Sequence, residues 1–330
     1  MARHGTGPGR LIRAAGLSLV LYAAAFGLLL DRPLSLGFLQ AQIEAKLARA
    51  RSIQGRKLVI LAGSNGPYSH RCEIIEPISG IPCVNGGVAV GIGLDYLFAR
   101  WKPLLHPGDL VYLPMEEAQY IRPRSAIRLG PDAAIMLRHD RETLLALPPD
   151  RWLSAFFSGD VRTAAMSLVE TVLIAAGFRD PRAGVTGSMN AWGDHIGHTQ
   201  ALGAVNAPLI ARLSPDHPAA SAVRAGDGSA EIARFLGWAR EHGVEAVGGF
   251  PTGFSDSPIP PETRDAILRI YTANKARFLE LPNESRYPRS DFFDTADHLD
   301  ETGQIAHSRL VARALTGSVA QADAGVTGSR

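Results

Sequence analysis

The sequence is poor in cysteine and in aromatic residues, and it has almost no excess of charge of either sign. Its 330 residues include two cysteines and 7% aromatic residues, and the formal net charge is +2. No basic stripe with interleaved aromatic residues is present, so we expect no nucleic-acid partner. Cys72 and Cys83 lack the spacing of metal ligands, and the sequence leaves open whether they form one disulfide or remain two buried thiols.

Charged residues are absent from one long stretch, residues 14–30, which follows three arginines. As a helix that begins at Leu11, this stretch would rise about 30 Å, enough to span a bilayer. The arginines predict a cytoplasmic amino terminus and an exported domain. The small residues 23–25 favour a cleaved signal peptide instead, but the apolar run continues to Leu30, so we predict an uncleaved single-pass anchor over residues 1–33. The domain would then lie in the periplasm, at the inner membrane of a bacterium.

The rest of the chain alternates between strand-like and helical patterns. Apolar residues at helical spacing among charged ones predict an amphipathic stalk helix over residues 34–56. The strand-like runs cover residues 57–62, 81–84, 110–113, 244–250 and 277–281. Their alternation with helices predicts an α/β domain over residues 57–316, with a flavodoxin-like, doubly wound parallel sheet of five strands. We interpret residues 121–228 as an insertion that shapes a substrate cleft, and residues 317–330 as a flexible tail.

A serine and a histidine follow strand-like segments at opposite ends of this domain. Ser64 lies in LAGSNG, directly after the first strand, and His298 lies in FFDTADHLDETG, before the last helix. The carboxyl ends of parallel strands meet at one edge of a sheet, so the two side chains can meet there. A histidine can take the proton of a serine, and a carboxylate such as Asp294 can orient the imidazole. The alternative is that Ser64 and Asp294 only cap the helices that follow them.

These motifs resemble the SGNH hydrolase superfamily over about residues 57–316. The similar blocks are LAGSNG after the first strand, VNGGVAVGIG after the second and DTADHLDETG before the last helix. The anchor, HPGDLVYLPMEEAQY and D-T-x-x-H-L-x-x-x-G look most like the membrane-anchored branch that acts beside polysaccharide or cell-wall acyltransferases. The resemblance implies that Ser64 is the nucleophile, His298 the general base and Asp294 the acid. The usual acid of the superfamily lies three positions before the histidine, where this chain has Thr295.

The donors that would stabilise an oxyanion depart further from the superfamily pattern. The backbone N–H of Ser64 is one candidate, and Gly87 or Gly91 could supply another because glycine lets the backbone approach a substrate closely. The superfamily's asparagine after the third strand is absent, and Glu116 occupies that region. Asn190, from the expected insertion, is a candidate replacement. Glu116 could instead bind sugar hydroxyls or remain a solvated loop charge.

A second polar motif, Asp194, His195 and His198, has D-H-x-x-H spacing that could hold a metal ion. A hydrogen-bonded polar loop explains it more simply, so we predict no metal and no cofactor. Trp192 beside the motif could stack on a sugar ring or belong to the core.

Together these features predict a serine-dependent acyl-ester enzyme. The resemblance implies O-acetyl or acyl transfer onto an exported polysaccharide, such as cellulose or alginate, together with a multispan membrane-bound O-acyltransferase. A periplasmic carbohydrate acetyl-esterase is one alternative. A non-catalytic SGNH-like subunit that binds glycan or scaffolds a secretion complex is the other, and the missing asparagine favours it.

Overall fold

The computed structural model describes residues 8–29, 34–157 and 188–327, and a few positions between 169 and 177. The chain divides into two compact units. One comprises residues 1–38 and 128–183, and the other comprises residues 39–127 and 184–330. The second unit contains the sheet and every residue of the predicted catalytic set.

The sheet has five parallel strands in the order β2-β1-β3-β4-β6. They are β1 (Leu58–Ile60), β2 (Cys83–Asn85), β3 (Leu110–Leu113), β4 (Glu245–Gly249) and β6 (Arg277–Leu279). This order is that of a flavodoxin-like doubly wound sheet, so the predicted α/β class and the five parallel strands are confirmed. Each strand of this five-stranded sheet lies within, or overlaps, a run that the sequence predicted.

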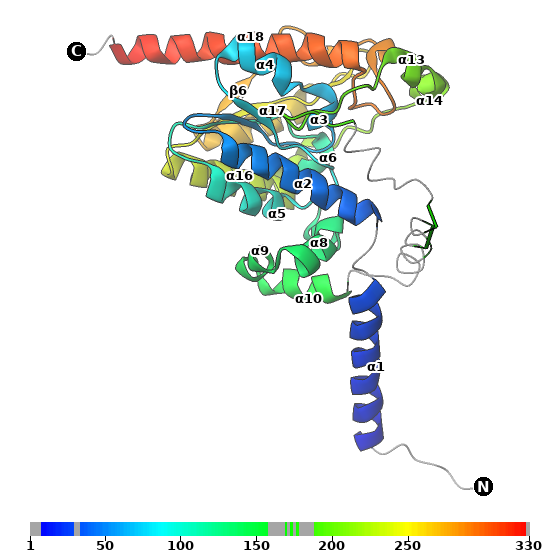
Figure 1. Cartoon of the computed structure of the whole chain (residues 1–330). Helices are drawn as coiled ribbons and strands as arrows, with labels where there is room; N and C mark the ends of the chain where they lie inside the picture. Colours follow the sequence, from blue (N-terminus) through cyan, green and yellow to red (C-terminus); the bar gives the residue numbers. More distant parts are fainter. Residues whose placement is uncertain are drawn as a thin grey trace. The chain divides into compact units, whose positions relative to one another are not determined.

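The strands form because their residues are apolar on both faces, as parallel strands require when helices cover both sides. Leu58, Ile60, Leu110 and Tyr112 are fully buried and pack, with Val247, on one face. The helices α4 (Cys72–Ser79) and α18 (Glu301–Thr327) cover that face (Figure 1).

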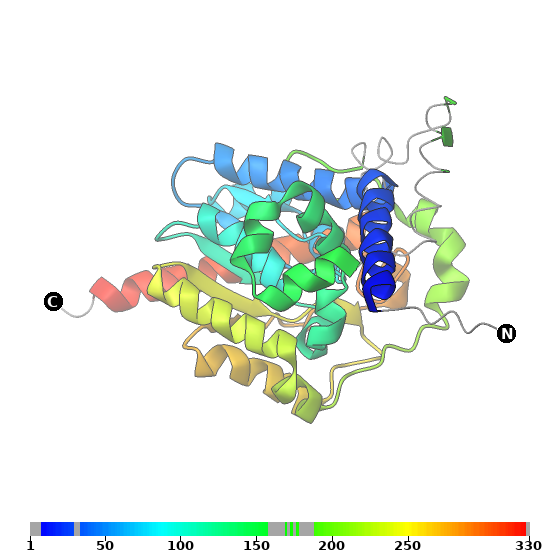
Figure 2. The ribbon, with the colours of Figure 1, turned by 90° about the horizontal axis from the view of Figure 1, so that it is seen from below.

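The helices α5 (Leu94–Trp101), α16 (Asp227–Glu241) and α17 (Pro261–Ala273) belong to the other layer. In Figure 1, α5 and α16 lie on the side of the sheet away from α18, and Figure 2 shows α16 beside α17. The Phe98 ring of α5 stacks on Phe235 of α16, with ring centroids 4.2 Å apart. The sheet is therefore enclosed on both sides, and its carboxyl edge remains for loops that carry polar side chains.

Shorter elements complete this unit. They are α3 (Asn65–Ser69), η1 (Lys102–Leu104), α6 (Glu117–Ile121), α13 (Gln200–Gly203), η2 (Ala204–Asn206), α14 (Ala207–Ile210), α15 (Ala220–Ala225), η3 (Arg289–Asp291), and the two-stranded parallel sheet of β5 (Gly253–Phe254) and β7 (Arg286–Tyr287). The helix α7 (Arg124–Arg128) ends where the first unit resumes.

The expected stalk helix is α2 (Leu34–Ser52), and it differs from the prediction in its packing. From residue 39 on it belongs to the unit that contains the sheet. Leu47 is 1% exposed and Lys46 is 2% exposed, and the Lys46 ammonium donates to the carbonyl oxygens of Gly87 and Gly193. The helix is therefore a part of the domain and not a spacer before it.

Two other boundaries also differ from the expected ones. The expected insertion, residues 121–228, is divided, because residues 184–228 belong to the unit with the sheet. Residues 317–330 were expected to form a flexible tail, but the last helix, α18, continues through most of them to Thr327. The Ala- and Gly-rich composition of the tail suggested a loose segment, whereas alanine is also the best helix former.

In the other unit, the helices α8 (Pro131–His139), α9 (Arg141–Ala146) and α10 (Pro149–Phe157) form a small helical cluster. A buried ion pair between Asp132 and Arg151 joins α8 to α10. The Asp140 carboxylate accepts hydrogen bonds from Thr143 and so caps α9.

The helix α1 (Pro8–Leu29) forms where the membrane anchor was predicted. Within the described parts of the chain, however, the structure contains no helix with the length and apolar character needed to cross a bilayer. The membrane-spanning part of the prediction therefore finds no support in the structure.

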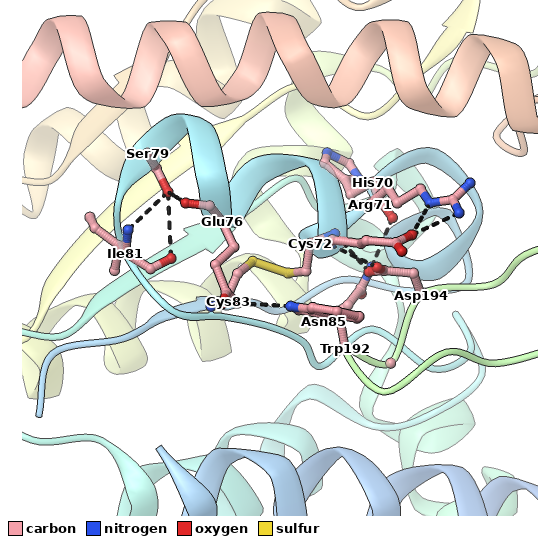
Figure 3. Close-up of a disulfide and its surroundings, with 12 residues drawn as sticks. His70, Arg71, Cys72, Glu76, Ser79, Ile81, Cys83, Asn85, Trp192 and Asp194 are labelled. Atoms are coloured by element: carbon pink, nitrogen blue, oxygen red, sulfur yellow. Dashed lines mark hydrogen bonds and ion pairs between the residues drawn. A yellow bond between two sulfur atoms is a disulfide. The ribbon is translucent and has the colours of Figure 1, made fainter. Parts of the chain in front are cut away.

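A disulfide joins Cys72, the first residue of α4, to Cys83, the first residue of β2 (Figure 3). The buried Asp194 carboxylate accepts hydrogen bonds from the backbone N–H groups of Cys72 and Glu73, and from the Asn85 side chain. Asp194 therefore satisfies two of the free N–H groups that begin α4. The disulfide and this carboxylate fix the segment that follows the serine loop.

Candidate active site

Ser64 lies at the carboxyl edge of the sheet, between β1 and α3. It occupies the position before the helix, but its side chain makes no capping hydrogen bond. The Ser64 hydroxyl, which is partly exposed, instead donates to Glu116 Oε1 at 3.4 Å. The simple capping interpretation of Ser64 is therefore wrong, and its hydroxyl faces a side chain from the end of β3.

Asp294 and His298 form a hydrogen-bonded pair in the loop before α18. The loop folds back on itself through an antiparallel bridge between Phe292 and Leu299, and Phe293 N donates to His298 O at 2.9 Å. This bend brings Asp294 Oδ1 to 2.7 Å from His298 Nδ1. A proton on Nδ1 then leaves Nε2 as the basic nitrogen of the ring.

The carboxylate that begins α18 is Asp300 and not Asp294. Asp300 accepts a hydrogen bond from Gly303 N at 2.7 Å, in the first turn of the helix. The alternative in which Asp294 caps the last helix is therefore wrong, and the Asp294 carboxylate is committed to His298.

Tyr68 connects the histidine to the serine helix. It lies on α3, four residues after Ser64, and its ring stacks on the His298 ring with centroids 4.1 Å apart and planes at 9°. The opposite face stacks on His195, also at 4.1 Å. Burial, with the nearby Asp294 charge, raises the pKa of Tyr68 to about 12, so the phenol is neutral. Tyr68 was not among the residues predicted from the sequence, although its helical spacing from Ser64 would have placed it on the same side of α3.

Glu116 is the residue that both halves of the site face. Its Oε1 accepts hydrogen bonds from the Ser64 hydroxyl and, at 3.1 Å, from Asn65 N. Glu116 is 6% exposed, and this burial raises its pKa, while the backbone of Asn65 and the charge of His298 lower it. A Cβ atom on Gly63 would lie 2.3 Å from Glu116 Oε1, so glycine is required there for the carboxyl group to approach.

A second carboxyl group, Asp297, accompanies Glu116. Burial and then the charge of Glu116 raise the pKa of Asp297 to about 7. Its backbone carbonyl accepts hydrogen bonds from the hydroxyls of Ser69 and Thr252, both at 2.8 Å. Asp297 adjoins His298 in the sequence, but its electrostatic interaction with Glu116 depends on the fold. Acidic groups that share a site hinder one another's ionisation.

The three residues proposed as oxyanion donors lie in different surroundings. Gly87 packs against the serine loop, because a Cβ atom there would lie 2.8 Å from Gly63 O. Its N–H donates to Asn85 Oδ1 at 3.3 Å. Gly91 lies in the turn that Ile92 N closes on Ala89 O, beyond Gly87.

The Asn190 side chain forms hydrogen bonds within its own turn. Its amide donates to Asp194 Oδ2 at 3.0 Å, and its oxygen accepts from the backbone of Trp192 and Asp194. The Asn190 amide and the Gly87 N–H therefore already have other hydrogen-bond partners, whereas Gly91 follows Val90, whose backbone packs against Gly63 beside Ser64. Trp192 packs against the core cluster and donates to Glu76 Oε2 at 2.8 Å, which favours its core interpretation over a sugar platform (Figure 3).

The D-H-x-x-H motif forms a polar cluster. The Asp194 carboxylate accepts a hydrogen bond from the first N–H group of α4. His195 Nδ1 lies 3.1 Å from His198 Nδ1. Burial lowers the pKa of His195 and of His198 to about 4, so both rings are neutral at neutral pH. Within the described ranges, no group of three or more acidic, histidine or cysteine side chains is arranged to hold a metal ion.

The edge of the sheet therefore holds a serine, an acid–histidine pair and two carboxyl groups of raised pKa. Such a set can support proton transfer to and from a serine, provided that the Ser64 hydroxyl turns from Glu116 to His298. Comparison of the chain with protein-family models, curated proteins and solved structures found no match. The SGNH resemblance stays a prediction from motifs, and the function must be argued from the site.

Proposed function

We propose that the chain is a serine-dependent acyl-ester enzyme with Ser64 as nucleophile, His298 as general base and Asp294 as the acid that orients it. The observation that carries the proposal is the 2.7 Å Asp294–His298 hydrogen bond, beside the helix that follows Ser64. The pair fixes the imidazole tautomer in which Nε2 can accept a proton.

In the proposed cycle, Ser64 Oγ attacks an ester carbonyl while His298 Nε2 takes the hydroxyl proton. The imidazolium then gives this proton to the leaving alcohol, and an acyl group remains on Ser64. Water releases this group as an acid, whereas a sugar hydroxyl accepts it as a new ester. The acceptor decides whether the enzyme is an esterase or an acyltransferase.

Glu116 affects how the oxyanion can be stabilised. Its Oε1 accepts a hydrogen bond from the backbone N–H of Asn65, the residue next to the nucleophile. A protonated Glu116, favoured by its raised pKa, can donate a hydrogen bond, whereas an ionised one repels a developing negative charge. The enzyme would therefore work through the neutral form of Glu116, in place of the asparagine of the SGNH pattern.

A surface pocket beside the acid–histidine loop offers a place for an acceptor. This surface pocket has a volume of about 570 Å³ and includes Arg289, Ser290 and Phe292 in its lining. Phe292 lies two residues before Asp294. We include in the proposal transfer to an exported polysaccharide, with a membrane-bound O-acyltransferase as acyl supplier and α1 as the membrane-associated segment. Support for α1 comes from exposed apolar side chains such as Ile12, which is 72% exposed.

A second candidate function is a non-catalytic glycan-binding or scaffold subunit. One observation favours it, namely that the Ser64 hydroxyl donates to Glu116 and not to His298. A carboxyl group beside the serine would then hold the hydroxyl in place and leave it unreactive.

The test is hydrolysis of p-nitrophenyl acetate by the purified full chain, with intact-mass detection and peptide mapping of an acyl adduct. We expect no acyl adduct at position 64 in Ser64→Ala, and formation of the Ser64 adduct slowed at least about 10³-fold in His298→Ala. Ser255→Ala, at an exposed serine, is the matched control and should leave turnover unchanged. Addition of a sugar acceptor then distinguishes transfer from hydrolysis. A folded chain with neither turnover nor adduct would favour the scaffold function.

A further inference from the structure

A second serine, histidine and carboxylate form a complete hydrogen-bonded chain that does not include Ser64. Ser257 Oγ lies 3.0 Å from His217 Nε2. On the other side of the ring, His217 Nδ1 lies 2.9 and 3.0 Å from the two carboxylate oxygens of Glu117. Two acceptor oxygens on Nδ1 place the imidazole proton there, so Nε2 accepts from the Ser257 hydroxyl.

Three separate parts of the fold hold these residues. Glu117 is the first residue of α6, His217 lies in the loop before α15, and Ser257 lies in the turn after β5. Ser257 N donates to Phe254 O at 3.2 Å, which closes this turn. The hydroxyl of Thr263 donates to Pro218 O at 2.7 Å and so ties the histidine loop to α17.

The exposure of the three side chains differs in a way that suits a reactive serine. The side chains of His217 and Glu117 are only 13% and 14% exposed, so their hydrogen bond is sheltered from water. Ser257 is half-buried, and Ser255 and Asp256 before it are exposed. A reagent can therefore reach the turn that carries the hydroxyl, while the base and the acid remain oriented.

We propose that Ser257, His217 and Glu117 form a second site that accepts acyl groups from small esters, independent of Ser64. Ser257 Oγ forms a bond to the acyl carbon, and the ester C–O bond breaks. The hydroxyl proton passes to His217 Nε2 and then to the leaving alcohol. Hydrolysis reverses the roles: His217 takes a proton from water, the water oxygen bonds to the acyl carbon, the bond between Ser257 Oγ and the acyl carbon breaks, and the proton returns to Ser257 Oγ. Glu117 stabilises the imidazolium in both steps.

The test uses a fluorophosphonate reagent on the full chain, followed by peptide mass mapping. The reagent phosphonylates a serine whose proton a histidine removes, and fluoride leaves. We expect an adduct on Ser257 both in the native chain and in Ser64→Ala, and none on Ser255, the exposed serine two positions away. Because the adducts are mapped separately, failure at Ser257 and failure at Ser64 are distinct results.

His217→Gln should slow labelling of Ser257 at least tenfold while labelling of Ser64 is retained. Glu117→Gln is a second variant that keeps the side-chain shape, and it should also slow labelling of Ser257. Circular dichroism and thermal unfolding establish that each variant is folded. The proposal is overturned if the folded native chain and Ser64→Ala show no Ser257 adduct, or if the adduct forms at the native rate in His217→Gln.

Discussion

The two serines of this chain stand in opposite situations. His298 has its carboxylate partner, but the Ser64 hydroxyl donates to Glu116. Ser257 has an uninterrupted connection through His217 to Glu117. The first site was predicted from sequence motifs, but its serine donates to Glu116, whereas the second has serine–histidine and histidine–carboxylate hydrogen bonds without a sequence motif.

The comparison shows that a site can have a serine beside ionisable groups without a serine–histidine hydrogen bond, and that the reverse is also possible. The Ser64 hydroxyl contacts Glu116, whose pKa is raised by burial, and carboxyl groups of raised pKa are frequent at functional sites. Ser257 has an oriented base in a half-buried turn. If Ser64 carries the main activity, it must exchange a hydrogen bond before it reacts, whereas Ser257 needs no such exchange.

The largest expected effect on turnover comes from replacing the carboxylate that orients His298. Asp294→Asn should reduce Ser64-dependent turnover by about 10³- to 10⁴-fold, because the amide can stabilise the wrong imidazole tautomer. The measurement is p-nitrophenyl acetate turnover with mapping of the acyl adduct. Asp291→Asn, in the same loop region, is the matched control. Unchanged turnover in Asp294→Asn would show that His298 does not serve as the base.

The next largest effect concerns the stability that the disulfide gives to the segment after Ser64. Cys72 and Cys83 close a loop of sequence separation 11, so replacing both with alanine should lower the free energy of unfolding by about 3 kcal/mol. Urea unfolding of the variant and the native chain measures this loss. The disulfide lies in the segment that follows Ser64, so labelling of Ser64 should weaken at lower urea than labelling of Ser257. If labelling of both serines weakened at the same urea concentration, the disulfide would not stabilise the Ser64 site separately from the Ser257 site.

The sequence predicted the sheet well, because buried parallel strands leave continuous apolar runs such as LVI in β1 and LVYL in β3. It also predicted the Asp294–His298 pair, since both residues lie in one short motif. Lys46 illustrates what it could not predict: a lysine among charged neighbours resembles a solvated residue. Its burial depends on carbonyl oxygens of Gly87 and Gly193 that only the fold brings near.

The second serine site could not be read from the sequence for a similar reason. His217 and Glu117 are 100 residues apart, and His217 and Ser257 are 40 apart, with no characteristic spacing. The carboxyl group of Glu116 was noticed, but its approach to Ser64 depends on the space left by Gly63. Local patterns predict elements and edges of sheets, whereas contacts between loops require the packed structure.

A smaller effect concerns the charge beside Ser64. Glu116→Gln should raise Ser64-dependent turnover about tenfold, because a neutral amide can donate to an oxyanion. A carboxyl group is neutral below its pKa and ionised above it. Since the pKa of Glu116 is raised and that of Asp297 is about 7, native turnover should be suppressed progressively as the pH rises. The ratio of variant to native turnover should therefore increase from pH 5 to pH 9.

The control for Glu116→Gln is Glu241→Gln, the same change at an exposed position at the end of α16, which should leave Ser64-dependent turnover at the native value. A ratio of Glu116→Gln to native turnover that stays constant with pH would show that ionisation of Glu116 does not limit the first site.

The smallest expected effect tests the ring that supports His298. Tyr68→Leu removes the stack between the His298 and His195 rings, worth about 0.5–1.5 kcal/mol, and should lower Ser64-dependent turnover roughly two- to tenfold. Tyr68→Phe keeps the aromatic ring and should retain nearly native turnover, because stacking and not the neutral hydroxyl positions His298. Labelling of Ser257, whose histidine has no contact with Tyr68 among the described interactions, should be the same in both variants. If Phe and Leu reduce turnover equally, the hydroxyl of Tyr68 acts in the site, and the histidine is held by Asp294 alone.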